Sequence, residues 1–217
     1  MASRVGVIAI LVLVAMGGLA GSGRSEPSAA TAIYTVRVDP RLCPSPLCGG
    51  YWIALANGAR TRCVDRTYAV RCYVAGASYA DRQIAIPDGA LARAAVESVV
   101  VEGIGRLGVL AVAAVYAPAG TAAVSGGFYR VVDTGIRCIR APCFSYRATQ
   151  VNGSTRTTMS SVDLAASGAT SSEIARAQAA LQTKNGLYAR GRFARTDDGG
   201  TIFRALRLYL RAPQPRA

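Results

Sequence analysis

The sequence predicts an α+β fold of two tandem repeats, each with the element order β-β-β-α-β-β and one helix packed on a curled antiparallel sheet. Three observations predict it. The chain resembles itself at a fixed offset of 95 residues, segments rich in β-branched and aromatic residues alternate with turn signals, and each half holds one segment with helix signals. A helix on one face of an antiparallel sheet buries the apolar side of both elements.

The internal duplication sets the domain boundaries. Residues 33–58 match residues 128–153 at seven positions: Tyr34/Tyr129, Val36/Val131, Cys43/Cys138, Cys48/Cys143, Tyr51/Tyr146, Asn57/Asn152 and Gly58/Gly153. Further on the offset falls to 83, so a segment of 12 residues around Cys63 and Cys72 belongs to the first repeat alone. We therefore expect repeat 1 at 33–119, a linker at 120–127, repeat 2 at 128–213 and a tail at 214–217.

In repeat 1, strands are expected at residues 33–38 and 51–56, where Tyr, Thr and Val are frequent. Asn57-Gly58 is a strong hairpin signal, and a third strand follows at about 68–75. Pro87-Asp88 has the form of a helix start, which predicts a helix over about 89–98. The closing strands are expected at 99–103 and 109–116.

In repeat 2, the third strand is expected at 155–164, and Ser171 or Ser172 caps a helix over 173–184. Ile174, Ala177 and Leu181 then lie on one face of that helix, at spacings of three and four. The closing strands, 187–195 and 201–210, are joined by a turn at 197–200.

The N-terminus has the pattern of an export signal. Arg4 precedes an apolar run at residues 5–16, and small residues follow up to Ala20. We expect a signal peptide at 1–20, a flexible lead-in at 21–32, and secretion or periplasmic export. The alternative is an uncleaved anchor, but residues 5–20 are shorter than the ~20 residues that span a bilayer. No later segment is long enough to cross a membrane.

The six cysteines are even in number, which in an oxidising compartment favours disulfides. Of the possible pairings, the duplication favours Cys43–Cys48, Cys138–Cys143 and, by their joint presence in repeat 1, Cys63–Cys72. A zinc site would need further Cys or His ligands at matching spacing, and a redox pair would need a C-x2-C motif. We therefore predict no metal and no cofactor.

The composition argues against an enzyme. The chain has no His, which removes the commonest general base and metal ligand, and its 12 acidic residues are scattered. No catalytic residue is predicted.

The net charge is +13, and all but one of the 25 basic residues are Arg. This excess reflects either codon usage or an anionic partner. Arg190, Arg192, Arg207 and Arg211 lie on two adjacent predicted strands, where they form either a face for an anionic ligand or an ordinary solvated surface. Nucleic acid is not an expected partner of an exported protein.

The Cys-x4-Cys loops are the other candidate site. Their exposed candidates are Pro44, Ser45, Pro46, Leu47, Ile139 and Arg140. Each loop is either a structural staple or a rigid element that docks a partner. Asp39, beside Arg41, forms a turn or an ion pair, and aromatics such as Trp52 and Tyr73 fit either a carbohydrate-binding face or sheet packing.

We predict a secreted, non-enzymatic binding or structural module. Its partner would be an extracellular protein or an anionic cell-surface polymer. The alternative is an inhibitor of extracellular hydrolases that acts through the two loops.

A family resemblance rests on three strings of residues: Arg41-x-Cys43-x-Ser45-Pro46-Leu47-Cys48-Gly49-Gly50-Tyr51, Thr61-Arg62-Cys63 and Cys72-Tyr73-Val74-Ala75. This pattern resembles a domain of unknown function in secreted proteins of GC-rich bacteria. It covers residues 33–118 and, more weakly, the second repeat, which suggests two copies. The resemblance implies export and disulfides, and no activity.

Overall fold

A computed structural model describes residues 31–213 of the chain. These residues form a 13-stranded sheet, a separate two-stranded hairpin and a single α-helix. The predicted α+β fold with a helix in each repeat is therefore wrong, because the protein is mostly β. The predicted signal peptide at 1–20, almost all of the lead-in at 21–32 and the tail at 214–217 lie outside the described residues.

The first half of the chain holds nine strands. They are β1 (Ala32–Val38), β2 (Tyr51–Leu55), β3 (Thr61–Arg62), β4 (Tyr68–Ala69), β5 (Cys72–Val74), β6 (Ala77–Tyr79), β7 (Arg82–Gln83), β8 (Leu91–Val101) and β9 (Gly105–Ala119). The second half holds β10 (Gly127–Asp133), β11 (Tyr146–Gln150), β12 (Arg156–Met159), β13 (Ser161–Asp163), the 3-10 turn η1 (Ala165–Ser167), helix α1 (Ser171–Leu181), β14 (Leu187–Arg195) and β15 (Thr201–Arg211).

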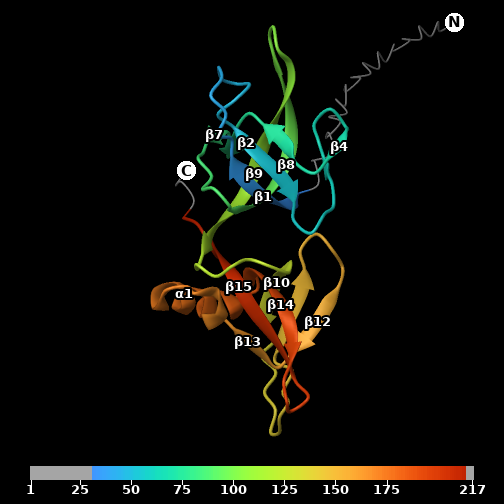
Figure 1. The fold of residues 1–217 in the computed structure, drawn as a ribbon, viewed down its shortest axis with the longest axis vertical. Helices are drawn as coiled ribbons and strands as arrows, with labels where there is room; N and C mark the ends of the chain where they lie inside the picture. Colours follow the sequence, from blue (N-terminus) through green and yellow to red (C-terminus); the bar gives the residue numbers. More distant parts are fainter. Residues whose placement is uncertain (1–30, 214–217) are drawn as a thin grey trace, which may run out of the picture.

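The strand order of the large sheet has the same pattern from either end: β5-β2-β1-β8-β9-β15-β14-β10-β11-β12. β1 lies between β2 and β8, as β10 lies between β11 and β14. β9 and β15 meet in the middle as antiparallel neighbours, and β6 and β13 add to them as short parallel strands. Figure 1 shows the result, an elongated molecule with the first half at one end and the second half at the other.

The helix predicted over residues 89–98 is instead the start of the long strand β8. Leu91, Ala92 and Ala94 are fully buried, since β8 pairs with β1 on one side and with β9 on the other. The Ala-rich segment has helical propensity, but pairing on both edges and burial of the small side chains outweigh a preference of less than about 1 kcal/mol per residue. The valines that follow at 99–101 continue the same strand.

The helix of the second half does form. Thr170, rather than Ser171 or Ser172, is its N-cap: Thr170 and Glu173 form a capping box that satisfies backbone N–H groups at the helix start. Ala177 and Leu181 are buried in the core of this half, together with Phe203 and neighbouring strand residues. In Figure 1 the helix lies at one side of the second half only.

Two asparagines join the halves reciprocally. Asn57, in the turn after β2, donates its amide to the carbonyl oxygens of Phe128 (2.7 Å) and Val151 (3.0 Å) and accepts from the Phe128 N–H. Asn152, in the turn after β11, makes the equivalent three bonds with Ile33 and Ala56. The turn asparagine of each half is therefore hydrogen-bonded to the backbone of the other half.

A shared apolar cluster lies at the same junction. Its buried members come from both halves and include Ile33, Leu91, Tyr116, Phe128 and Tyr209. Each half also has a cluster of its own. Because the sheet is continuous and this cluster spans the junction, the two halves form one packed unit.

Candidate functional site

Three disulfides are present, and no cysteine is free among residues 31–213. Cys43–Cys48 and Cys138–Cys143 each close a short loop, and Cys63–Cys72 links hairpin β3–β4 to β5. These are the pairs that the sequence predicts. The loop of Cys43–Cys48 connects β1 to β2, and the loop of Cys138–Cys143 connects β10 to β11.

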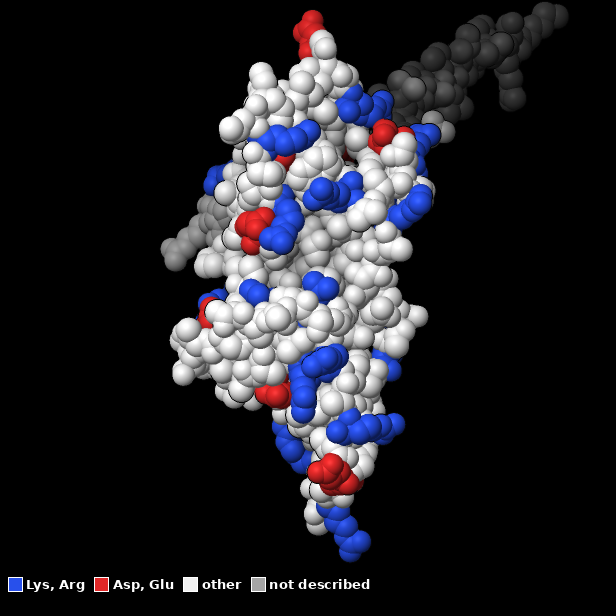
Figure 2. Space-filling view, viewed as in Figure 1, with Lys and Arg blue, Asp and Glu red and all other residues white. Residues whose placement is uncertain are grey.

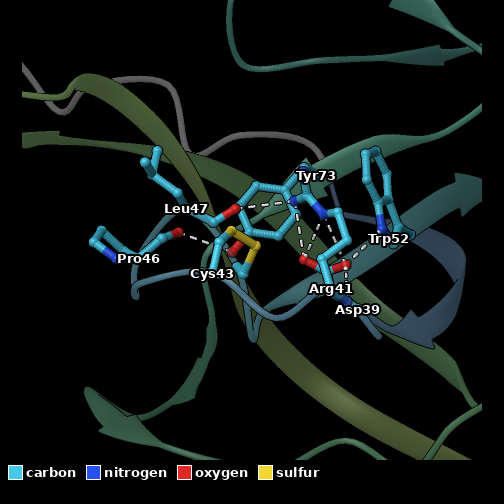
Figure 3. A network of polar contacts seen from close by, with 8 residues as sticks. Asp39, Arg41, Cys43, Pro46, Leu47, Trp52 and Tyr73 are labelled. Carbon is cyan, nitrogen blue, oxygen red and sulfur yellow. Dashed lines mark hydrogen bonds and ion pairs between the residues drawn. A yellow bond between two sulfur atoms is a disulfide. The ribbon is translucent and has the colours of Figure 1, made fainter.

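Asp39, directly after β1, anchors the first loop. Its side chain has no exposed surface. The Arg41 guanidinium donates through Nε to Oδ1 and through Nη2 to Oδ2, both at 2.9 Å, and Trp52 Nε1 donates to Oδ1 at 3.2 Å (Figure 3). The Arg41 backbone N–H also donates to Oδ1, at 3.2 Å. The predicted turn and the predicted ion pair are thus both present, and a two-point charged pair of this kind is strong and directional.

The pair stays ionised over a wide pH range. The hydrogen bonds from the Arg41 side chain lower the pKa of the Asp39 carboxyl to about 2, although desolvation acts in the opposite direction. The same hydrogen bonds raise the pKa of the Arg41 guanidinium.

Arg41 also connects the anchor to the loop itself. Its Nη2 donates to the carbonyl oxygen of Leu47 at 2.9 Å, and the Tyr73 hydroxyl donates to the carbonyl oxygen of Pro46 at 2.8 Å. The guanidinium carbon lies 5.0 Å from the ring centroids of both Trp52 and Tyr73. Figure 3 shows these groups converging on the inner side of the loop. The loop is therefore held by its disulfide and by side chains from two neighbouring strands.

The outer side of the first loop is open to solvent. Leu42 is fully exposed, at 103%, and Leu47 is 48% exposed. Pro44 and Ser45 are exposed as well, whereas Pro46 is half-buried. A leucine held in this position gains free energy when another surface covers it.

The second loop has a related construction. Arg137 makes a two-point ion pair with Asp133, at 3.0 and 2.9 Å, and the backbone N–H and hydroxyl of Thr134 both donate to the carbonyl oxygen of Ser145. Ile139 is fully exposed, at 104%, and Arg140 is also exposed. An aliphatic side chain thus stands at each disulfide loop.

The two loops lie far apart. In Figure 1 the blue loop between β1 and β2 is at the upper end of the molecule, and the yellow loop between β10 and β11 is at the lower end. The candidate binding residues 44–47 and 139–140 therefore do not form one surface, and each loop is an independent candidate site.

Two of the four arginines of the predicted anionic face line the same cavity. Arg190 and Arg207 lie directly opposite each other on β14 and β15 and line one cavity. Arg192 instead faces Arg204, and Arg211 lies opposite Tyr116. A register shift between Arg190 and Gly191 leaves an extra residue on β15, between Ala205 and Arg207, next to the Arg190–Arg207 pair.

Residues 32–215 match the model of a family described as Domain of unknown function (DUF6748). The chain belongs to this family. A single DUF6748 match spans both halves of the sheet. The expected membership of an uncharacterised family is confirmed, while the family's motif, its taxonomic range and its presence in two copies stay predictions. The chain matches no curated protein and no solved structure.

Several residues of the DUF6748 candidate sites had no signal in the sequence. Leu42 is one residue outside the Cys43–Cys48 ring, and an aliphatic residue before a cysteine is unremarkable. Arg37, Phe128 and Tyr209 are distant along the chain and meet only because the two halves pack together. The recurrence of Asn57 as Asn152 was visible, but it indicated a turn rather than a contact between halves.

The DUF6748 domain shows neither a cluster of metal ligands nor a membrane-spanning helix among residues 31–213. Within residues 31–213 no group of three or more Cys, Asp or Glu side chains could hold a metal ion. No helix in this range is long and apolar enough to cross a bilayer.

Proposed function

We propose that this DUF6748 protein is an exported, non-enzymatic binding module that docks an extracellular protein through its disulfide loops. The observation that carries the proposal is Leu42, fully exposed beside a loop that a disulfide and the ion pair of Arg41 with the buried Asp39 hold in place. A rigid loop loses little conformational entropy when it binds, so its apolar side chain contributes more of its burial energy to affinity.

Export is supported by the cysteines. All six form disulfides, and such bonds persist in oxidising compartments outside the cytoplasm. The apolar run that predicts a cleavable signal peptide supports the same location. The absence of His from the chain supports a function without acid–base catalysis.

The proposal includes an origin by duplication. The symmetric strand order and the reciprocal Asn57 and Asn152 bonds support two related halves. Because the halves present their loops at opposite ends, the protein would bind two partners separately, one through Leu42 and Leu47 and one through Ile139 and Arg140.

A capture experiment tests this function. Wild-type protein and the variants Leu42→Ser and Ile139→Ser are immobilised, and secreted and envelope proteins of the producing organism are captured and quantified by mass spectrometry. Val100→Ser is the matched control, because Val100 is also exposed but lies on β8, outside the disulfide loops. We expect at least one protein to lose about tenfold or more of its capture with a loop variant and none with the control. Equal capture by all four proteins would contradict the proposal.

A hydrolase inhibitor is the second candidate. It is favoured by the same constrained loops, since an inhibitor must present an exposed side chain on a backbone that does not adapt, and Leu47 and Arg140 are such side chains. The purified protein is assayed against a panel of extracellular hydrolases. Inhibition should disappear with Leu47→Ala or Arg140→Ala while the unfolding temperature stays the same. Inhibition that survives both substitutions would exclude this mechanism.

A further inference from the structure

A cavity of about 460 Å³ opens at the junction of the two halves. Its walls come from β1, the loop before β8, the end of β9, the segment that links the halves, β10, β14 and β15. The lining side chains that matter for its chemistry are Arg37, Asp88, Phe128, Arg190, Arg207 and Tyr209. Figure 2 shows basic side chains around the middle of the molecule, where the two halves meet.

The charges in this cavity do not balance. Arg37 is neutralised by Asp88, with an N–O distance of 2.7 Å. Arg190 and Arg207 face each other across β14 and β15, and neither forms an ion pair with any acidic residue in the described part of the chain. Like charges directly opposite on neighbouring strands repel each other. The cavity therefore holds two cationic groups whose repulsion an anion would relieve.

Both guanidinium groups are fixed by the segment that links the halves. Arg190 Nε donates to the carbonyl oxygen of Gly126 at 3.0 Å, and Arg207 Nη2 donates to that of Ala122 at 3.1 Å. Arg207 Nε is buried and has no hydrogen-bond acceptor. These bonds occupy one nitrogen of each group, and a guanidinium has five N–H donors, so both retain donors for a ligand.

Aromatic and apolar groups complete the cavity. The Arg190 guanidinium lies 4.9 Å from the ring centroid of Phe128. Tyr209, Val124 and Pro118 also line the walls. Burial raises the pKa of the Tyr209 hydroxyl, while the nearby guanidinium groups of Arg190 and Arg207 act to lower it. The Tyr209 side chain therefore lies within the positive electrostatic potential of these two arginines.

We propose that this cavity binds a small organic oxyanion, a carboxylate or a phosphate monoester, with its anionic group between Arg190 and Arg207 and its apolar part against Phe128 and Tyr209. Guanidinium groups match both oxyanions in geometry. The volume is within the range of small-molecule sites. This site is independent of the partner docking proposed for the loops, so either proposal can fail without the other.

The test is a calorimetric titration of the purified protein, at low salt, with three probes of similar size: benzoate, phenyl phosphate and benzyl alcohol. We expect saturable binding of at least one anion, weakening with added salt, and no measurable binding of the neutral alcohol. The stronger of the two anions identifies the oxyanion that the site prefers. Absence of saturable binding by either anion, or equal binding of the alcohol, would overturn the proposal.

Charge-matched variants locate the binding. Arg190→Gln and Arg207→Gln should each lower the affinity by at least about tenfold, whereas Arg192→Gln, which removes the same charge from β14 outside the cavity, should change it less than about twofold. An equal loss with Arg192→Gln would show a general effect of net charge and overturn the assignment.

A second measurement needs no variant. In an NMR titration of the wild-type protein, the anion should shift resonances of Phe128 and Tyr209 and leave those of Phe144, beside the second disulfide loop, unchanged. Shifts confined to other regions would contradict the site even if the Gln variants fail to fold.

Discussion

At the scale of single residues, Asn57 and Asn152 lie in exposed turns and yet connect the two halves through hydrogen bonds. Each has a left-handed backbone, with φ of 63° and 55°, a conformation that Asn tolerates better than most residues. Each also makes three hydrogen bonds to the backbone of the other half. Asparagine therefore both adopts the backbone conformation of the turn and forms the hydrogen bonds of the junction.

The first prediction concerns this junction. Asn57→Ala and Asn152→Ala should each lower the free energy of unfolding by about 1–3 kcal/mol, because backbone groups of the other half lose their partners. Urea unfolding followed by circular dichroism measures the change. Asn185→Ala is the control, since Asn185 is exposed on the loop after α1. A loss no larger than that of Asn185→Ala would show that the junction bonds contribute nothing.

The second prediction concerns pH. The pKa of Asp39 is lowered to about 2, so the ionised carboxylate favours the folded state above the pKa of the unfolded chain. That contribution is fully present above about pH 4 and is lost as the pH falls toward 2.

Asp39→Asn should therefore be less stable than wild type at pH 7, and the difference should shrink between about pH 4 and 2. Thermal unfolding at a series of pH values measures it, with Asp197→Asn in an exposed turn as the control. A difference that stays constant down to pH 2 would mean that the Asp39–Arg41 ion pair does not stabilise the fold.

At the scale of elements, β8 shows how context decides between helix and strand. Its first residues have the composition of a helix, yet the segment lies between two strands whose edges need partners. In α1 no such competition exists, since the helix packs with its Ala177–Leu181 face on the sheet and its start is capped by Thr170. The same local signals were therefore correct in one half and wrong in the other.

The third prediction concerns the close approach of β14 and β15 at Gly191. A Cβ on Gly191 would collide with the carbonyl oxygen of Arg204 and the ring of Phe203. Gly191→Ala should therefore destabilise the protein by roughly 1–3 kcal/mol and displace the neighbouring Arg190. Gly76→Ala is the control, because no atom lies within 4 Å of its Cβ position. Denaturant unfolding compares them, and equal stability of the two variants would contradict the close approach.

At the scale of the whole molecule, the continuous sheet holds the candidate sites apart from one another. The disulfide loops are at opposite ends (Figure 1). The proposed oxyanion cavity is lined by residues of both halves, where they meet. Partner docking and ligand binding can therefore be examined by separate variants. Because β9 and β15 join the halves in the middle of the sheet, neither half has a complete sheet without the other.

The fourth prediction concerns the mature protein. A non-reduced peptide map of exported material should show Cys43–Cys48, Cys63–Cys72 and Cys138–Cys143, and an N-terminus near Gly21. The proposed export takes the chain through an oxidising compartment, where disulfides form and a signal peptide is removed. Intact mass measured with and without reductant is the control. Free thiols or a retained N-terminus would contradict the proposed location.

The sequence by itself determined the short-range features of this protein. Cysteine spacing and the repeat predicted all three disulfides, and β-rich composition with turn signals predicted the principal strands, including β14 with its bounds. The capping pattern located α1 to within a few residues. Local patterns predict these features well because each depends on neighbours in the chain: a small disulfide ring, a strand edge or a helix cap.

Only the tertiary structure decided the fold class and the sites. β8 became a strand because β1 and β9 offered hydrogen bonds on both sides, a fact absent from its own residues. The distance between the two loops, and the meeting of Arg190 with Arg207 in a cavity, follow from joining the halves through β9 and β15 with a register shift at Gly191. Contacts between residues far apart in the chain fix these features, and local sequence patterns do not encode such contacts.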